Sequence, residues 1–167
     1  MFTDIFKKKL KYLIIGAGST GATFACFLHS AKKDVTLISK YEDIIQNAKR
    51  NNGINLKSNV KGDKTYKVKI KTEKDYNEKA DVIILCIRTP DILSAIPLIQ
   101  KASHKKTIIT SISNGFGISW ALNKKFPNLS VLDSNFVGKC RWFDRENVEY
   151  LQLREYCEFN FADKYNK

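Results

Sequence analysis

Three glycines near the start of the chain have the spacing of a phosphate-binding loop. They are Gly16, Gly18 and Gly21, with an apolar run on either side. Between a strand and a helix, the first glycine permits a tight turn, the second lets the backbone approach a pyrophosphate, and the third lets the helix pack on the strand. The helix amino terminus adds free N–H groups and a positive dipole end. We therefore expect a dinucleotide site with loop residues Gly16, Ala17, Gly18, Ser19, Thr20 and Gly21.

Ser39 and Lys40 end the second predicted strand, where the adenosine ribose of a dinucleotide lies. An Asp or Glu here usually holds the 2′-hydroxyl of NAD, whereas a basic residue accommodates the 2′-phosphate of NADP. The first carboxylates of this chain, Glu42 and Asp43, come after Lys40. A lysine neutralises a phosphate as a point charge and a serine can add a hydrogen bond, so the pair favours NADP. The alternative is that Lys40 is an exposed loop residue.

Two further side chains follow later apolar runs and would face the same crevice. Asn114, in Asn114-Gly115-Phe116-Gly117, carries a carboxamide that can donate to and accept from a ribose or a carbonyl. Its alternative role is that of a turn residue before Gly115. Arg88 can stack on an adenine face or attract an anionic substrate. Its alternative role is that of a surface arginine beside a helix.

Alternating strands and helices must position these residues. Apolar, β-branched runs predict parallel strands covered on both faces, and segments with helical spacing lie between them. We expect strands over residues 11–16, 34–39, 80–87, 106–112 and 129–132, and helices over residues 20–31, 41–51, 90–101 and 118–125. This alternation predicts a single α/β domain over residues 1–167, with a Rossmann-type, doubly wound, mostly parallel sheet.

Two segments depart from this alternation. Residues 54–72 contain short alternating runs around a turn at residues 61–64, which predicts an antiparallel β insertion with lysines on one face. Basic residues beside Tyr66 can bind nucleic acid, but solvated lysines on an edge strand are the commoner arrangement. Residues 136–139 and 148–161 predict a strand and a hairpin, so we expect a β-rich extension over residues 141–167. Residues 1–10 are expected to form a basic leader.

Composition narrows the classes of partner. The chain has 29 Lys and Arg against 17 Asp and Glu, a formal net charge of +12. This charge favours anionic partners, of which a phosphorylated cofactor is one and nucleic acid another. The four cysteines form no CxxC pair, and with only two histidines no metal site is expected. No apolar span of 18 residues occurs, so we expect no transmembrane helix and a cytoplasmic location.

These motifs together resemble the N-terminal, NADP-binding domain of the 2-dehydropantoate 2-reductase (ketopantoate reductase) family. The resemblance covers about residues 11–140, in the order and approximate spacing of that family. The Asn-Gly-x-Gly element after a strand is more specific than the glycine loop. The segments that carry the resemblance are residues 15–21, 35–40, 52–54, 81–88 and 113–117.

In that family NADPH reduces a 2-keto acid to a 2-hydroxy acid for pantothenate and coenzyme A synthesis. The resemblance implies that Lys40 holds the 2′-phosphate and that Asn114 contacts both cofactor and substrate. It also implies that Arg88 lies on the adenosine or substrate side and that Gly138 lies beside the nicotinamide. NADPH is then the expected cofactor and a small 2-keto acid the expected substrate. Whether the protein forms a homo-oligomer is left open, and neither nucleic acid nor a membrane is expected as a partner.

The family's helical second domain supplies a catalytic lysine and a glutamate, and we expect that domain to be absent from this chain. Lys139, Lys164 and Lys167 do not lie in the family's lysine-bearing helix, so the catalytic residues stay unassigned. The leading hypothesis is the cofactor-binding part of an NADPH-dependent 2-keto acid reductase. The alternatives are a non-catalytic NADP-binding or redox-sensing module and a basic nucleic-acid-binding protein.

Overall fold

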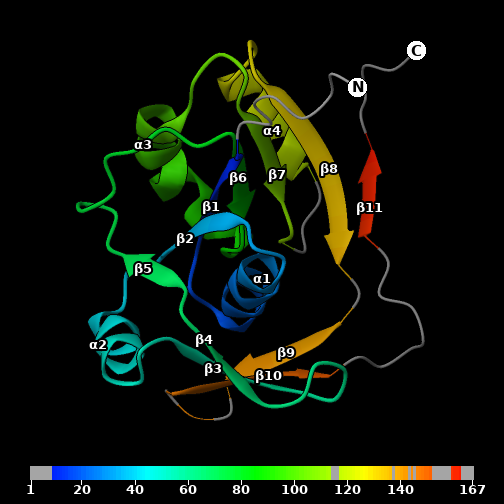
Figure 1. Ribbon diagram of the computed structural model, residues 1–167. Helices are drawn as coiled ribbons and strands as arrows, with labels where there is room; N and C mark the ends of the chain where they lie inside the picture. Colours follow the sequence, from blue (N-terminus) through cyan, green and yellow to red (C-terminus); the bar gives the residue numbers. More distant parts are fainter. Residues whose placement is uncertain are drawn as a thin grey trace, which may run out of the picture.

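The computed structural model describes residues 9–113, 117–136, 138–142, 144, 146–151 and 159–162. Within these ranges the strands form a seven-stranded central sheet and a separate four-stranded sheet (Figure 1). Helix α1 lies between the two sheets, and its rings pack on strands of both. The basic leader expected over residues 1–10 lies almost wholly outside the described residues.

The central sheet has the strand order of a dinucleotide-binding domain. In spatial order its strands are β11 (Phe159–Ala162), β8 (Ser130–Phe136), β7 (Ile108–Ser111), β6 (Val82–Leu85), β1 (Lys11–Ile15), β2 (Asp34–Ile38) and β5 (Lys69–Lys71). Six of them are parallel, and only β11 runs antiparallel, beside β8. Numbered along the chain, the parallel strands have the order 3-2-1-4-5-6, so the Rossmann prediction is confirmed.

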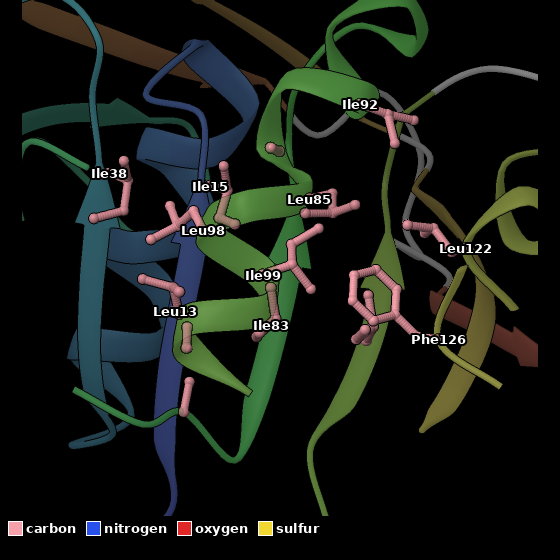
Figure 2. Packing of buried hydrophobic residues seen from close by; sticks show 14 of the residues in the cluster. Leu13, Ile15, Ile38, Ile83, Leu85, Ile92, Leu98, Ile99, Leu122 and Phe126 are labelled. Carbon is pink, nitrogen blue, oxygen red and sulfur yellow. The ribbon is translucent and has the colours of Figure 1, made fainter. Parts of the chain in front are cut away.

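Helices cover both faces of the central sheet. On one face, α3 (Ile92–Ala102) and α4 (Ile118–Lys125) pack on the strands, as Figure 2 shows for Leu98 and Leu122. On the other face lies α1 (Ser19–Ser30), whose Phe24 shares a buried cluster with Ile14 of β1. The strand interiors are apolar on both sides because both sides are buried. The sheet is therefore doubly wound, as predicted.

The four-stranded sheet combines residues from two distant parts of the chain. Its order is β4 (Lys64–Tyr66), β3 (Ile54–Ser58), β10 (Asn147–Leu151) and β9 (Lys139–Trp142). Strands β9 and β10 form an antiparallel hairpin, and β10 pairs in parallel with β3. The sheet packs on α1 through the edge-to-face pair of Phe27 and Tyr150, whose ring centroids are 5.1 Å apart. A hairpin is present, but it spans residues 139–151 rather than the expected 148–161, because β11 pairs with β8 of the central sheet and not with β10. The proposed boundary at residue 141 falls inside β9.

The predicted β insertion is correct in its first half and wrong in its second. Strands β3 and β4 pair antiparallel, as expected. The chain then turns at Tyr66, whose carbonyl accepts a hydrogen bond from the Val68 amide at 2.8 Å. Strand β5 leaves the insertion and pairs in parallel with β2, because the edge of the central sheet beside β2 is otherwise open. The lysines of the predicted insertion are consequently divided between two sheets, with Lys69 and Lys71 in the central sheet and Lys57 and Lys64 in the four-stranded one.

The remaining helices and strands lie where the sequence predicts them, and differ only in the residues at which they begin and end. Helix α2 (Glu42–Arg50) follows β2, and a 3₁₀ turn (Thr89–Asp91) precedes α3, so the first-turn proline is confirmed at Pro90. Strand β8 extends four residues beyond the expected end at residue 132, because it pairs with β7 on one side and β11 on the other. Among the described residues, no helix has the length and apolarity needed to cross a bilayer.

Candidate cofactor-binding site

Two glycines of the loop between β1 and α1 are required by close packing. Gly16 has a φ of +108°, and a Cβ there would lie 2.5 Å from the Cys86 carbonyl oxygen. A Cβ on Gly21 would lie 2.0 Å from the Gly16 carbonyl oxygen. These contacts let α1 start directly against the ends of β1 and β6. The turn and helix-packing roles expected for the first and third glycines are therefore confirmed.

Gly18 differs because it faces open space. A Cβ at this position would have no atom within 4 Å, and the residue lines a cavity. Gly18 is also the N-cap of α1, and its carbonyl accepts the first helical hydrogen bond, from the Ala22 amide at 2.9 Å. The first turn of α1 carries no acidic side chain that would compete with a bound anion. The loop thus has the shape and polarity that a pyrophosphate needs.

The cavity beside this loop has a volume of about 840 Å³, within the range typical of small-molecule sites. It lies at the carboxyl ends of β1, β2 and β6, where the strand order reverses and dinucleotides bind in this architecture. Its apolar side includes Ile15, Ile38 and Leu98, which lie close together in Figure 2. Six of the predicted cofactor-binding residues line it, namely Gly16, Ala17, Gly18, Ser39, Lys40 and Arg88.

Ser39 and Lys40 have different environments in the cavity wall. The Ser39 side chain is buried, and its hydroxyl donates to the Tyr41 carbonyl and accepts from the Tyr41 amide, both at 3.0 Å. A phosphate would have to displace the first of these bonds to receive the Ser39 proton. Lys40 is exposed, and its ammonium lies 5.5 Å from the centroid of the Tyr41 ring. The charge at this strand exit therefore comes from Lys40, and Ser39 shapes the turn that presents it.

Arg88 lies on the opposite side of the cavity, where β6 ends. Its Nε donates to Asp91 Oδ2 at 3.0 Å, and its side chain is 81% exposed. An exposed pair of this kind contributes little to stability and does not fix the side chain. The other guanidinium N–H donors keep their capacity to contact a ligand. Arg88 thus contributes positive charge to the rim, reduced by the neighbouring carboxylate.

The cavity also has walls that the sequence did not reveal. Thr72 and Lys74 line it from the segment after β5, and Lys101 lines it from α3. The segment after β5 is held beside the β2 exit by a hydrogen bond from the Ser39 amide to the Lys71 carbonyl at 3.1 Å. Sequence reasoning missed Lys74 because β5 was assigned to the insertion. Placing residues 69–71 as the third parallel strand would have identified it.

Four of the predicted site residues do not line the cavity. Ser19 begins α1, and its Oγ donates to the Cys140 carbonyl at 3.1 Å. Thr20 and Gly21 belong to the first turn of α1. Gly138 joins β8 to β9, and a Cβ there would lie 2.4 Å from the end of the Phe136 ring. The structure thus explains these positions by packing, and their cofactor contacts stay predictions.

Asn114, the residue expected to contact both cofactor and substrate, lies outside the described residues. The neighbouring Ser113 is described, and its hydroxyl donates to the Ile87 carbonyl. This bond links the ends of β6 and β7, the two strands whose exits were predicted to face one crevice. The roles of Asn114 stay predictions.

The Cys86 thiol lines the cavity but is not suited to acid–base or nucleophilic chemistry. Burial raises the pKa of this thiol far above its ordinary value, so it stays neutral at physiological pH. Across the described ranges, no three His, Cys, Asp or Glu side chains are grouped so as to hold a metal ion. The site therefore combines a glycine loop at a helix amino terminus, an apolar pocket and a rim that carries lysines and Arg88.

Comparison with known proteins agrees with this geometry. A family model described as "Ketopantoate reductase PanE/ApbA" matches residues 12–152, which is most of the chain. The chain belongs to the ketopantoate reductase family. A 2-dehydropantoate 2-reductase of Lactococcus lactis is 24% identical over 136 residues, covering 80% of this chain and 41% of the relative. Another from Streptococcus pyogenes is 27% identical over 119 residues, covering 71% and 38%. The chain thus spans about two fifths of the length of these relatives.

Several solved structures share the fold of this chain. A putative 2-dehydropantoate 2-reductase from Enterococcus faecalis superposes with a TM-score of 0.78 at 23% identity, over 91% of this chain and 48% of that chain. A D-mandelate dehydrogenase in a ternary complex with NADH and anilino(oxo)acetate superposes with a TM-score of 0.77 at 24% identity, over 86% and 46%. The same fold therefore occurs in a putative 2-dehydropantoate 2-reductase and in a D-mandelate dehydrogenase, and the latter structure contains NADH.

Proposed function

We propose that this chain is the cofactor-binding part of an NADPH-dependent reductase that converts 2-dehydropantoate to pantoate for pantothenate and coenzyme A synthesis. The observation that carries the proposal is the cavity of about 840 Å³ between the glycine loop and a basic strand exit. Membership of the ketopantoate reductase family supports the 2-keto acid as substrate. The curated relatives named above are 2-dehydropantoate 2-reductases.

The preference for NADPH rests on the β2 exit. Lys40 lies at the rim of the cavity, and the nearest acidic side chains downstream begin α2. One of these, Asp43, accepts a hydrogen bond from the Ile44 amide at 2.9 Å within that first turn. No carboxylate takes the place of Lys40 at the end of β2, which favours a 2′-phosphate over a 2′-hydroxyl, although Glu73 lines the cavity from the segment after β5. The fold alone does not decide between the cofactors, because a structural neighbour holds NADH.

The residues of this chain would bind and orient the cofactor. The amide groups of the glycine loop would receive the pyrophosphate, Lys40 the 2′-phosphate, and the apolar wall of Ile15 and Ile38 the adenosine. When bound, the reduced nicotinamide supplies the hydride, and the protein supplies orientation and charge. Reduction of a keto acid also needs a group that stabilises the developing alkoxide. That group is not assigned to any described residue.

A cofactor titration tests the proposal. We expect the wild-type chain to bind NADPH more tightly than NADH, and Lys40→Ala to lower the affinity for NADPH about tenfold, as for a lost hydrogen bond to a charged group. The affinity for NADH should not change. Lys105→Ala is a suitable control, because Lys105 is exposed in the turn that leads into β7, at the other end of the strand from the cavity. Equal wild-type affinities for the two cofactors would contradict the NADPH assignment.

A turnover assay separates the proposed reductase from a non-catalytic NADP-binding module. The module is a relevant alternative because none of the described cavity residues is assigned to stabilise the alkoxide that forms during reduction. NADPH oxidation that depends on added 2-dehydropantoate supports the reductase. NADPH binding without such oxidation shows that this 167-residue chain does not complete the reaction alone, which both the module and the proposed cofactor-binding part predict.

A further inference from the structure

The glycine loop is attached to the four-stranded sheet on one side. Ser19 Oγ donates to the Cys140 carbonyl at 3.1 Å, and the indole Nε1 of Trp142 donates to the Ala17 carbonyl at 3.3 Å. Cys140 and Trp142 are alternate residues of β9 and project from the same face of that strand. A backbone carbonyl and a side chain of β9 therefore hold the start of α1 and the loop peptide that precedes it.

The bond from Trp142 fixes the direction of a peptide group. The Ala17–Gly18 peptide is trans, because the described residues contain no cis bond. In a planar trans peptide the carbonyl oxygen and the amide hydrogen point in opposite directions. With the Ala17 oxygen directed at Trp142, the Gly18 N–H is directed away from β9. Gly18 lines the cavity and Trp142 does not, so this N–H is aimed at the ligand side.

The indole is itself held in place before any ligand arrives. Trp142 is half-buried against the core between α1 and the second sheet. In the β9–β10 hairpin it is paired with Val148, which is fully buried. The indole N–H can only donate, so the Ala17 carbonyl satisfies it completely. The orientation of the loop peptide is therefore built into the hairpin and does not depend on the cofactor.

We infer that Trp142 is a positioning residue of the pyrophosphate site, which keeps the Gly18 amide directed at the phosphates of the cofactor. The inference rests on the proposed cofactor binding and deepens it. Trp142 acts through the Ala17 carbonyl and does not touch the ligand. Its effect is therefore confined to the part of a ligand that carries the 5′-pyrophosphate.

Ligands with and without that group test the inference. Trp142→Phe retains an aromatic ring and removes the N–H donor, and Trp120→Phe is the matched control because Trp120 is 63% exposed on α4. We expect Trp142→Phe to weaken ADP-ribose and NADPH by about threefold to tenfold, the effect of one lost hydrogen bond. The affinity for adenosine 2′-monophosphate, which lacks the pyrophosphate, should stay at the wild-type value. Trp120→Phe should change none of the three affinities.

Any other result contradicts the inference alone or the inference together with the proposed function. Unchanged ADP-ribose affinity in Trp142→Phe overturns the inference alone, and so does an equal loss for adenosine 2′-monophosphate, which would indicate general structural damage. A wild-type chain that binds no ADP-ribose overturns both the inference and the proposed function. If Trp142→Phe does not fold, the indole N–H resonance of Trp142 in the wild type decides the question. That resonance should show a hydrogen-bonded indole, protected from exchange with water, both with and without ADP-ribose, and a freely exchanging indole N–H overturns the inference.

Discussion

Gly18 and Gly21 lie three residues apart, and substitution by alanine should mainly affect cofactor binding at the first and stability at the second. A methyl group at Gly21 would meet the Gly16 carbonyl, so we expect Gly21→Ala to lower the free energy of unfolding by at least about 2 kcal/mol. Gly18 has open space and a φ of −66°, so Gly18→Ala should cost at most about 1 kcal/mol. Its methyl group would nevertheless occupy the space of the pyrophosphate and weaken NADPH binding. Chemical denaturation and cofactor titration of both variants check this pair.

Lys74 should act together with Lys40 on the 2′-phosphate. The two lysines line the cavity from different segments, one after β2 and the other after β5, which are adjacent strands. We expect Lys74→Ala to lower NADPH affinity about threefold while NADH affinity stays constant, because an exposed ammonium contributes modestly. Cofactor titration measures both values, with Lys105→Ala as the control. An equal loss for NADH would place Lys74 at the adenine or pyrophosphate instead.

Some residues of the candidate site could be predicted from the sequence and others could not. The glycines and Lys40 were found because their roles depend on short spacing along the chain. Trp142 was not, because its bond to the Ala17 carbonyl joins residues 125 positions apart. Only the pairing of β10 with β3 brings the hairpin to the glycine loop. No local pattern encodes that contact.

At the level of elements, apolar runs identified β1, β2, β6 and β7 because buried parallel strands are apolar on both faces. Strand β5 was misassigned for a physical reason. Its residues Lys69, Ile70 and Lys71 alternate like an edge strand, and an edge strand can pair with either sheet. The choice of β2 as its partner is made by the tertiary fold. The error also hid the cavity wall at residues 72–74.

The Glu78 carboxylate links β1, inside the central sheet, to the edge strand β5. Glu78 accepts hydrogen bonds from Lys11 of β1 at 2.7 Å and Lys71 of β5 at 3.2 Å. These bonds hold the pKa of Glu78 below its ordinary value. Because the folded pKa is depressed, the stabilisation is present above the unfolded pKa and is lost as the pH falls through the folded one.

We therefore expect Glu78→Gln to reduce stability at pH 7 and to differ less from the wild type at pH 3. The urea midpoint of each protein at both pH values measures this difference. The exposed Glu73 gives a control, since Glu73→Gln removes a carboxylate outside this ion-pair network. A gap between Glu78→Gln and the wild type that is equal at both pH values would contradict the prediction.

On the scale of the whole molecule, α1 joins the two sheets. Six consecutive residues of the helix, 21–26, are buried. On one side they meet the central sheet, and the following residue, Phe27, packs on the Tyr150 ring of the four-stranded sheet. Such a helix is nearly apolar all round, which the sequence showed as an unbroken apolar run after the glycine loop. The reason for that run, a second sheet on its outer side, was not apparent from the sequence.

The burial of α1 on both sides limits how this protein can vary. A helix on the surface of a sheet has an outer face where polar residues can be exchanged freely, but residues 21–26 have none. Substitutions are tolerated only at the ends of the helix, and one end is the cofactor loop. A substitution that moves the four-stranded sheet is expected to move α1, and with it the glycine loop at the start of α1. A second substitution, in α1 or in the β9–β10 hairpin, would then be needed to restore the position of the loop. Substitutions in the outer sheet are therefore expected to affect the cavity through α1, although that sheet lines no part of it.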